Sequence, residues 1–284
     1  MFEQILVNGL LASLIYVIMA LGFTLIFGIM RIVNFAHGEF YMVGAVLVLF
    51  LFGTLGWPFF IAVAAGGVLS ALLGVIAERV LFRPLVQDEL SCMIMSLALG
   101  IILQSLALIA FGPAEQSVTR PFAGTWSLAD TVVPWDRTIV AGSALVILTA
   151  FYAFLKYSRV GLAMQAVAQD PETSSLMGVE SCAVYALAFG IACLLAGLAG
   201  GLMAPIYTIG PYMGELPMLK AFVVVILGGL GSIPGAVLGG LLLGLSESTL
   251  ATLLDSGLAM IASFAIVLVV VITRPAGLLG RVAR

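Results

Sequence analysis

The sequence predicts an all-α fold, a polytopic transmembrane helix bundle of about seven or eight spans with a glycine-rich discontinuous or re-entrant hairpin. The chain has 284 residues, of which 63% are hydrophobic and 9% are charged, whereas a soluble domain carries about 25% charged residues. So much apolar surface requires the bilayer as its solvent. The 32 glycines suit helices whose backbones approach closely. We therefore interpret residues 1–284 as a single transmembrane domain.

Candidate spans follow from the apolar runs, because a helix needs about 20 apolar residues to cross a bilayer. Such runs cover residues 5–30, 40–55, 58–77, 91–111, 138–155, 182–204 and 250–273. The second run is short, so we expect a tilted or incomplete span there. Residues 218–230 and 236–245 are each too short to cross alone, and the sequence GGLGSIPG at 228–235 breaks a helix. These two runs are the expected hairpin.

The distribution of Lys and Arg predicts the orientation, because basic residues accumulate in cytoplasmic loops. Basic residues follow the first, third, fifth and last runs, namely Arg31, Arg79, Arg83, Lys156, Arg159, Arg274, Arg281 and Arg284. The loop 112–137 mixes both signs of charge and holds Trp126 and Trp135, which suit an outer interface. We expect an external N-terminus and an external loop at 112–137, with a cytoplasmic loop at 158–180 and a cytoplasmic C-terminus. Residues 218–245 must then begin and finish outside, and Glu247 should lie at the external end.

A short internal repeat links two breaks in the helix pattern. Residues 26–28 lead into the sequence NFAHG at 34–38, and residues 226–228 lead into SIPG at 232–235. Transporters often place substrate sites at paired breaks, where a helix N-terminus suits a carboxylate. The candidate pathway residues are Asn34, His37, Glu39, Gly228, Gly229, Gly231 and Ser232, with Asn34 and Ser232 as expected helix caps. The alternative is structural: Asn34 and His37 stitch a turn at the cytoplasmic surface, and the glycines permit a tight turn.

Residues 158–180 form an amphipathic segment between two apolar runs. Asp170 can cap a short helix with Pro171 at its first position, and Gly178 can end it. The segment is either an interfacial linker helix or a docking helix for a cytoplasmic partner. The candidate docking residues are Gly161, Ala166, Asp170, Pro171, Leu176, Met177 and Gly178.

Three segments carry a resemblance to a known family. RIVNFAHGEFYMVGA at 31–45 resembles the N-terminal signature of the branched-chain amino acid ABC permease family, LivH type. Residues 161–179 resemble the cytoplasmic loop of that family, which contacts the ATPase, and residues 220–244 resemble its glycine-rich C-terminal element. The similarity covers essentially the whole chain. One departure is Gln165, where the family often has a basic residue that pairs with the ATPase.

The resemblance implies a permease subunit of an importer in a bacterial or archaeal cytoplasmic membrane. Its expected partners are a second homologous permease, two cytoplasmic ATPase subunits and an extracytoplasmic solute-binding protein. The family moves mainly Leu, Ile and Val, and relatives move urea, short amides and other amino acids. The sequence does not decide which solute this chain moves.

Other function classes receive little support from the residues. Neither lysine, Lys156 or Lys220, belongs to a GxxxxGK[ST] phosphate loop, so ATP hydrolysis is expected on separate subunits. The lone His37 excludes a His-based metal cluster, we expect no cofactor, and no basic patch favours nucleic acid. An intramembrane enzyme would need a nucleophile and base inside the spans, which we do not find. The remaining alternative, an ion-coupled secondary transporter, would keep ionisable residues within spans, whereas the middles of these runs are nearly free of charge.

Overall fold

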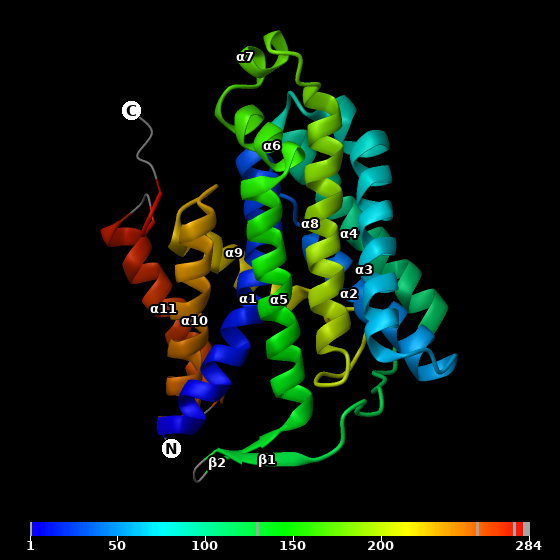
Figure 1. The fold of residues 1–284 in the computed structure, drawn as a ribbon, viewed down its shortest axis with the longest axis vertical. Coiled ribbons are helices and arrows are strands. Elements are labelled where there is room, and N and C mark those ends of the chain that lie inside the picture. Colours follow the sequence, from blue (N-terminus) through cyan, green and yellow to red (C-terminus); the bar gives the residue numbers. More distant parts are fainter. Residues whose placement is uncertain (1, 129–130, 254–255, 275–276, 281–284) are drawn as a thin grey trace.

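A computed structural model of the chain describes residues 2–128, 131–253, 256–274 and 277–280. Within them the chain is a bundle of long helices with a small β-hairpin at one end (Figure 1). Two of the arginines used to predict the orientation, Arg281 and Arg284, lie outside the described residues. The helices and strands in chain order are α1 Phe2–Met30, α2 His37–Val48, α3 Phe59–Ala77, α4 Glu89–Phe111, β1 Thr125–Leu128, β2 Thr131–Pro134, α5 Trp135–Tyr157, α6 Arg159–Gln169, α7 Pro171–Leu176, α8 Ser181–Met203, α9 Glu215–Gly228, α10 Ile233–Leu253 and α11 Ser256–Thr273.

Seven helices in the described part of the chain are long and apolar enough to cross a membrane. They are Gln4–Met30, His37–Thr54, Phe59–Leu85, Glu89–Phe111, Trp135–Tyr157, Ser181–Met203 and Ile233–Leu253. The predicted polytopic helix bundle is therefore confirmed. The short second run reaches 18 residues because α2 continues as a π-helical stretch at Leu49–Thr54.

The last two predicted elements have different bounds in the structure. Residues 236–245 were expected to be too short to cross, but α10 covers 21 residues and extends to Leu253. Its polar residues 246–249 keep their helical conformation because their side chains bond to the helix or to neighbouring helices. The predicted span 250–273 is consequently wrong at its start, which belongs to α10, and α11 covers Ser256–Thr273.

Close glycine contacts hold the helices of the bundle centre together. A Cβ added at Gly197 of α8 would lie 2.5 Å from the Ser70 Oγ of α3, and one added at Gly240 of α10 would lie 2.5 Å from Val17 of α1. These glycines therefore serve close helix packing, as the high glycine content predicts. The pairs Gly28 with Gly231 and Gly240 with Val17 also make α1 and α10 antiparallel.

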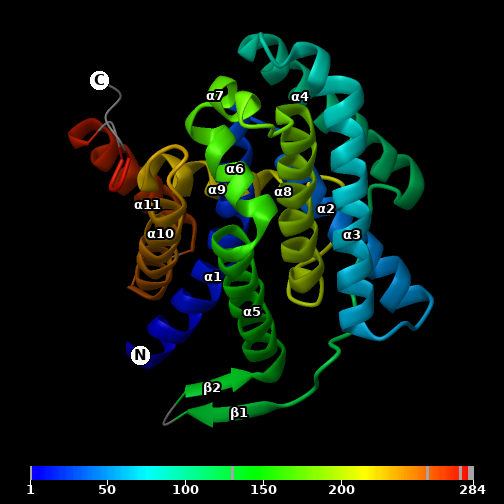
Figure 2. The ribbon, with the colours of Figure 1, turned by 45° about the horizontal axis from the view of Figure 1, so that its top comes forward.

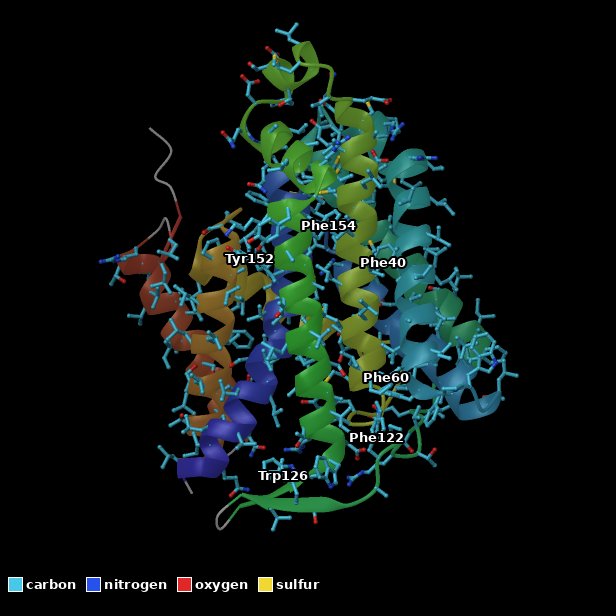
Figure 3. All side chains as sticks on the ribbon, viewed as in Figure 1. Phe40, Phe60, Phe122, Trp126, Tyr152 and Phe154 are labelled. Carbon is cyan, nitrogen blue, oxygen red and sulfur yellow. The ribbon has the colours of Figure 1, made fainter. Side chains whose placement is uncertain are left out.

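The loop 112–137 departs from the all-α prediction. Strands β1 and β2 form an antiparallel hairpin in which Trp126 pairs with Val133 and Thr125 with Pro134. Thr, Val and Trp favour extended backbone. The Trp126 Nε1 donates a hydrogen bond of 2.9 Å to the Thr138 Oγ1 at the start of α5. Figure 3 shows Phe122 beside Phe60 of α3, where the ring centroids are 5.8 Å apart, so the loop is anchored on both sides.

The two loops singled out in the sequence lie at opposite ends of the bundle. Figures 1 and 2 both show α6 and α7 at one end, and β1, β2 and the start of α1 at the other. The helix α10 returns from the α7 end to the end where α1 begins. This arrangement agrees with the prediction that the loops 112–137 and 158–180 lie on opposite sides of the membrane. The side of the membrane on which each end lies remains a prediction.

Candidate functional site

A cavity of about 390 Å³ lies between α1, α2, α9 and the loop that follows α8. Its size falls within the roughly 300–1,000 Å³ of small-molecule sites. The lining is mostly apolar and aromatic, with one basic and one acidic residue. It comprises Ala12, Ile15, Tyr16, Met19, Tyr41, Pro113, Glu115, Met203, Tyr207, Thr208, Gly210, Pro211, Tyr212, Met213, Leu216, Pro217 and Lys220.

Two loops line the cavity toward the β1 and β2 end. Gln116 and Ile209 form an isolated antiparallel bridge, in which the amide of each donates to the carbonyl of the other at 2.9 and 2.7 Å. This bridge joins the segment after α4 to the segment after α8. Figure 1 shows the second of these loops below α8, on the side of the β-hairpin. These two loops therefore border the cavity at the predicted external end.

A polar cluster of three side chains from three helices stands at the cavity wall. Lys220 Nζ of α9 lies 2.6 Å from Glu247 Oε1 of α10 and donates to the Tyr16 hydroxyl of α1 at 2.7 Å. The same Tyr16 hydroxyl donates to Glu247 Oε2 at 2.9 Å. The Lys220 ammonium also lies 4.8 Å from the centre of the Tyr16 ring. Each member therefore contacts both of the others, and the cluster ties α1, α9 and α10 together.

This cluster corrects the expectation that Glu247 lies outside the apolar region, although Glu247 does lie in the half of α10 nearer the end of the bundle where α1 begins. Glu247 belongs to the candidate span Ile233–Leu253, six residues before its last residue. It is tolerated there because Lys220 neutralises it and Tyr16 donates a further hydrogen bond. The bundle interior is thus less free of charge than the apolar runs suggest.

The first chain break lies within the bundle and is buried. Residues 31–36 carry the chain back along α1, so that His37, the first residue of α2, lies 3.1 Å through Nε2 from the Met19 carbonyl oxygen. Asn34 and His37 are buried, so neither stitches a turn at the surface. Asn34 Oδ1 accepts from the Ala36 amide at 3.1 Å, just before α2 begins. The N-cap position of α2 is Ala36 and no side chain caps the helix, so the predicted cap at Asn34 is wrong; Asn34 instead stabilises the turn that precedes α2.

Glu39 lies in the first turn of α2 and points away from the cavity lining. Its Oε1 accepts a hydrogen bond of 2.9 Å from Gln104 Nε2 of α4. Its Oε2 is buried and has no hydrogen-bond partner among the described residues. A Cβ added at Gly100 would lie 3.7 Å from the Glu39 Cγ, which places this carboxyl against α4.

The second break is closed by the chain itself. Gly229 and Gly231 have φ of 104° and 80°, a left-handed conformation that favours glycine. Ser232 Oγ accepts from the Gly235 amide at 3.2 Å and caps α10, as predicted. The carbonyls of Leu227 and Gly228, which end α9, accept hydrogen bonds of 2.9 and 3.0 Å from residues 278 and 279. Backbone partners thus satisfy the last two carbonyls of α9 at this break.

None of the seven predicted pathway residues lines the 390 Å³ cavity. The first break nevertheless shapes it, because Tyr41 lies one turn after His37 and lines the cavity wall. The start of α2 also meets the start of α9, where Gly38 and Gly214 are in backbone contact. Leu216 and Pro217 in the first turn of α9 line the cavity. The N-terminal parts of α2 and α9 therefore both border the cavity.

The lysine, glutamate and tyrosine of the polar cluster were missed by sequence reasoning. Lys220 stands in an apolar stretch of α9, and Glu247 follows the last glycine pair of α10. Ionisable residues inside apolar segments are candidate functional residues. Lys220 and Glu247 could have been singled out on that ground. Tyr16 had no distinguishing pattern, because an aromatic residue in an apolar run is ordinary.

At the opposite end of the bundle, α6 and α7 form the loop 158–180. Asp170 caps α7 by accepting from the amides of Glu172 and Thr173 at 3.0 Å each. The Thr173 side chain hydrogen-bonds to the Asp170 carboxylate and holds its pKa below the ordinary value. Pro171 is the first residue of α7, and Gly178 has φ of 87° after its end. The local structure predicted for residues 170–178 is confirmed.

The surface of this loop has one apolar tip and one tightly packed base. Leu176 and Met177 are 86% and 82% exposed at the tip. At the base, a Cβ on Gly161 would lie 2.5 Å from the Phe154 carbonyl oxygen, so α6 packs on the end of α5. Gln165 Nε2 donates to the Leu155 carbonyl at 2.6 Å, and Ala166 beside it is half-buried.

Comparisons with known proteins agree on one family. The family description "Branched-chain amino acid transport system / permease component" matches residues 5–272. The high-affinity branched-chain amino acid transport system permease protein LivH of Escherichia coli K12 is 34% identical over 304 aligned residues, which cover 99% of this chain and 96% of LivH. BraD of Pseudomonas aeruginosa, named for the same transport system, is 33% identical with the same coverage.

A more distant relative and the solved structures complete the comparison. A probable branched-chain amino acid transport permease protein LivH of Methanocaldococcus jannaschii is 27% identical over 89% of this chain and 82% of its own length. No solved structure matches the chain. With its seven candidate spans, the protein is a multi-pass membrane protein. The chain belongs to the family of permease components of branched-chain amino acid transport systems.

Proposed function

We propose that the chain is the permease subunit of an ATP-binding-cassette importer that moves branched-chain amino acids or related small solutes into the cytoplasm. The observation that carries this proposal is the match to named transport permeases over 99% of the chain. The membrane is the cytoplasmic membrane of a bacterium or archaeon. The 390 Å³ cavity is a binding site for the solute along the transport pathway. The loops that border the cavity face the external side.

The partners in this proposal are a second homologous permease, two ATPase subunits and a solute-binding protein. ATP hydrolysis takes place on the ATPases, since this chain has no phosphate loop. The loop 158–180 is the docking site for an ATPase. Its tip supports this role, because Leu176 and Met177 expose apolar surface that a groove on a partner would bury.

A reconstitution experiment tests the proposal. The chain is co-expressed with the candidate permease, ATPase and binding-protein subunits, purified as a complex and placed in proteoliposomes. We expect uptake of radiolabelled leucine that requires the binding protein and ATP on the ATPase side. Uptake that persists without ATP, or a chain that transports leucine alone, would contradict the proposal.

The Lys220 and Glu247 pair supports a second candidate, an ion-coupled secondary transporter, because such proteins carry ionisable residues within their spans. The same proteoliposomes separate the two candidates. An ionophore that collapses proton and sodium gradients should leave import by an ATP-driven complex unchanged. Loss of uptake with the ionophore, at saturating ATP, would favour the ion-coupled transporter.

A further inference from the structure

We propose that the Lys220 ammonium binds the carboxylate of the transported solute. Glu247 and Tyr16 hold this lysine ammonium in position at the cavity wall. This inference rests on the proposed function, because it concerns the solute of the same cavity. It selects a solute with a carboxylate over an amide of similar size that lacks one.

The hydrogen-bonding capacity of Lys220 leaves room for a ligand. A lysine ammonium has three N–H donors and no acceptor. Two of them bond to Tyr16 and Glu247, at 2.7 and 2.6 Å. The third has no acceptor among the described residues. A carboxylate oxygen is the group that would complete this set, with a charge-assisted hydrogen bond.

The three members of the cluster do not face the cavity equally. Lys220 and Tyr16 are among the lining residues, whereas Glu247 is not. Glu247 therefore holds the ammonium from outside the lining through its 2.6 Å contact, while Lys220 belongs to the cavity wall. Within the described lining, Lys220 is the single basic residue, so a solute carboxylate that enters the cavity has one cationic partner.

The rest of the lining matches a small amino acid with an apolar side chain. Ile15, Met19, Met203 and Leu216 supply apolar surface. Glu115 is the single acidic residue of the described lining and suits a solute ammonium group. Because Glu247 already neutralises Lys220, the added carboxylate is bound weakly. Weak binding suits a binding site on a transport pathway, because the solute must also leave it.

The rival interpretation is that the ion pair of Lys220 and Glu247 only stabilises the packing of α9 against α10. Removing Lys220 alone would not decide between them, because the half-buried Glu247 would lose its partner and the packing of α9 on α10 would weaken. The double variant Lys220→Met with Glu247→Gln removes both charges together. The exchange variant Lys220→Glu with Glu247→Lys keeps an ion pair but moves the cation to α10, behind the wall. Lys156→Met, at an exposed lysine on the opposite side of the bundle, is the matched control.

Cavity occupancy is measured directly, without ATP or the binding protein. A cysteine replaces Leu216, which lines the cavity and is 52% exposed, and serine replaces the exposed Cys182. The assembled complex in nanodiscs is labelled with a thiol reagent in the presence of L-leucine or of leucinamide, which lacks the carboxylate. We expect leucine to slow labelling of the parent and of Lys156→Met at concentrations about tenfold lower than leucinamide requires.

The variants decide between recognition and fastening. In the double variant and in the exchange variant we expect leucine to protect no better than leucinamide, while both still assemble in size-exclusion chromatography. Equal protection by the two compounds in the parent, or protection by leucine that survives in the exchange variant, would overturn the inference. If the double variant does not assemble, the exchange variant alone decides. Failure of ATP-driven uptake by the parent would instead reject the proposed function, and the protection assay does not depend on it.

Discussion

Gly239 of α10 faces α9 so closely that its replacement by alanine tests the packing of the hairpin. A Cβ added there would lie 2.6 Å from the Val224 carbonyl oxygen and 3.2 Å from the Gly228 amide nitrogen. Both are backbone atoms of α9, so neither can turn away. An ordinary contact begins at 3.4 Å, so moving from 2.6 Å to that distance separates the helices by 0.8 Å at this point.

The same separation would reach the polar cluster. Lys220 lies one turn before Val224 on α9, and Glu247 lies two turns after Gly239 on α10. Their Nζ to Oε1 distance of 2.6 Å would lengthen beyond the usual range of a hydrogen bond, roughly 2.7–3.2 Å. Overpacking of a tight interface costs about 1–3 kcal/mol. We therefore expect Gly239→Ala to lower stability and to weaken protection of the cavity by leucine.

The measurement is unfolding of the purified chain by titration with sodium dodecyl sulfate. Gly142→Ala is the control, because Gly142 is exposed on α5 and a Cβ there meets no atom within 4 Å. Both variants make the same chemical change in a long helix. A Gly239→Ala variant that unfolds at the same midpoint as Gly142→Ala would refute the inferred packing of α9 against α10.

Three further predictions concern the two ends of the bundle. Single cysteines at Ala123 and Ser175, both exposed, should be labelled by an impermeant thiol reagent from outside and from inside the cell respectively; external labelling at Ser175 would reverse the topology. Leu176→Asp should reduce solute-stimulated ATPase activity of the reconstituted complex while membrane insertion stays normal, because a partner groove would bury an unpaired charge; unchanged activity, with Leu176→Met as control, would exclude a docking role for the tip. Asp170→Ala should speed hydrogen exchange of the amides at 172–176, whereas Asp170→Asn should retain the cap. Since the Thr173 hydrogen bond lowers the pKa of Asp170, the cap is intact at neutral pH and is lost as the pH falls through that lowered value. Equal exchange in the parent and in Asp170→Ala at pH 7 would contradict this account.

Local sequence signals gave reliable local structure. At residues 170–178, the cap, the proline and the glycine act within a few residues of one another, so the sequence suffices to place α7. The high glycine content likewise predicted close helix packing, since a missing Cβ permits backbone approach in any bundle. Apolar run length fixed most spans for the same reason, because the bilayer sets the length independently of tertiary contacts.

Signals that depend on neighbouring helices were less informative. The predicted breaks at 34–39 and 228–235 overlap the observed ones at 31–36 and 229–232, but a break alone does not say what satisfies its backbone groups. At the second break, residues 278 and 279 do so, from a segment some fifty residues away. The pattern alone therefore could not separate a solute route from a closed turn. The role of both breaks in transport remains a prediction.

The sequence by itself determined that the chain crosses the membrane several times, where most of its spans fall, and to which family it belongs. These properties follow from apolar length, from residues close in the chain and from long signatures such as RIVNFAHGEFYMVGA at 31–45. The tertiary structure decided where a cavity lies and which charges meet at its wall. Tyr16 and Lys220 are 204 residues apart in the chain, yet 2.7 Å separates their polar atoms. Such a pairing depends on the packing of α1 and α9 against α10, which no local pattern specifies.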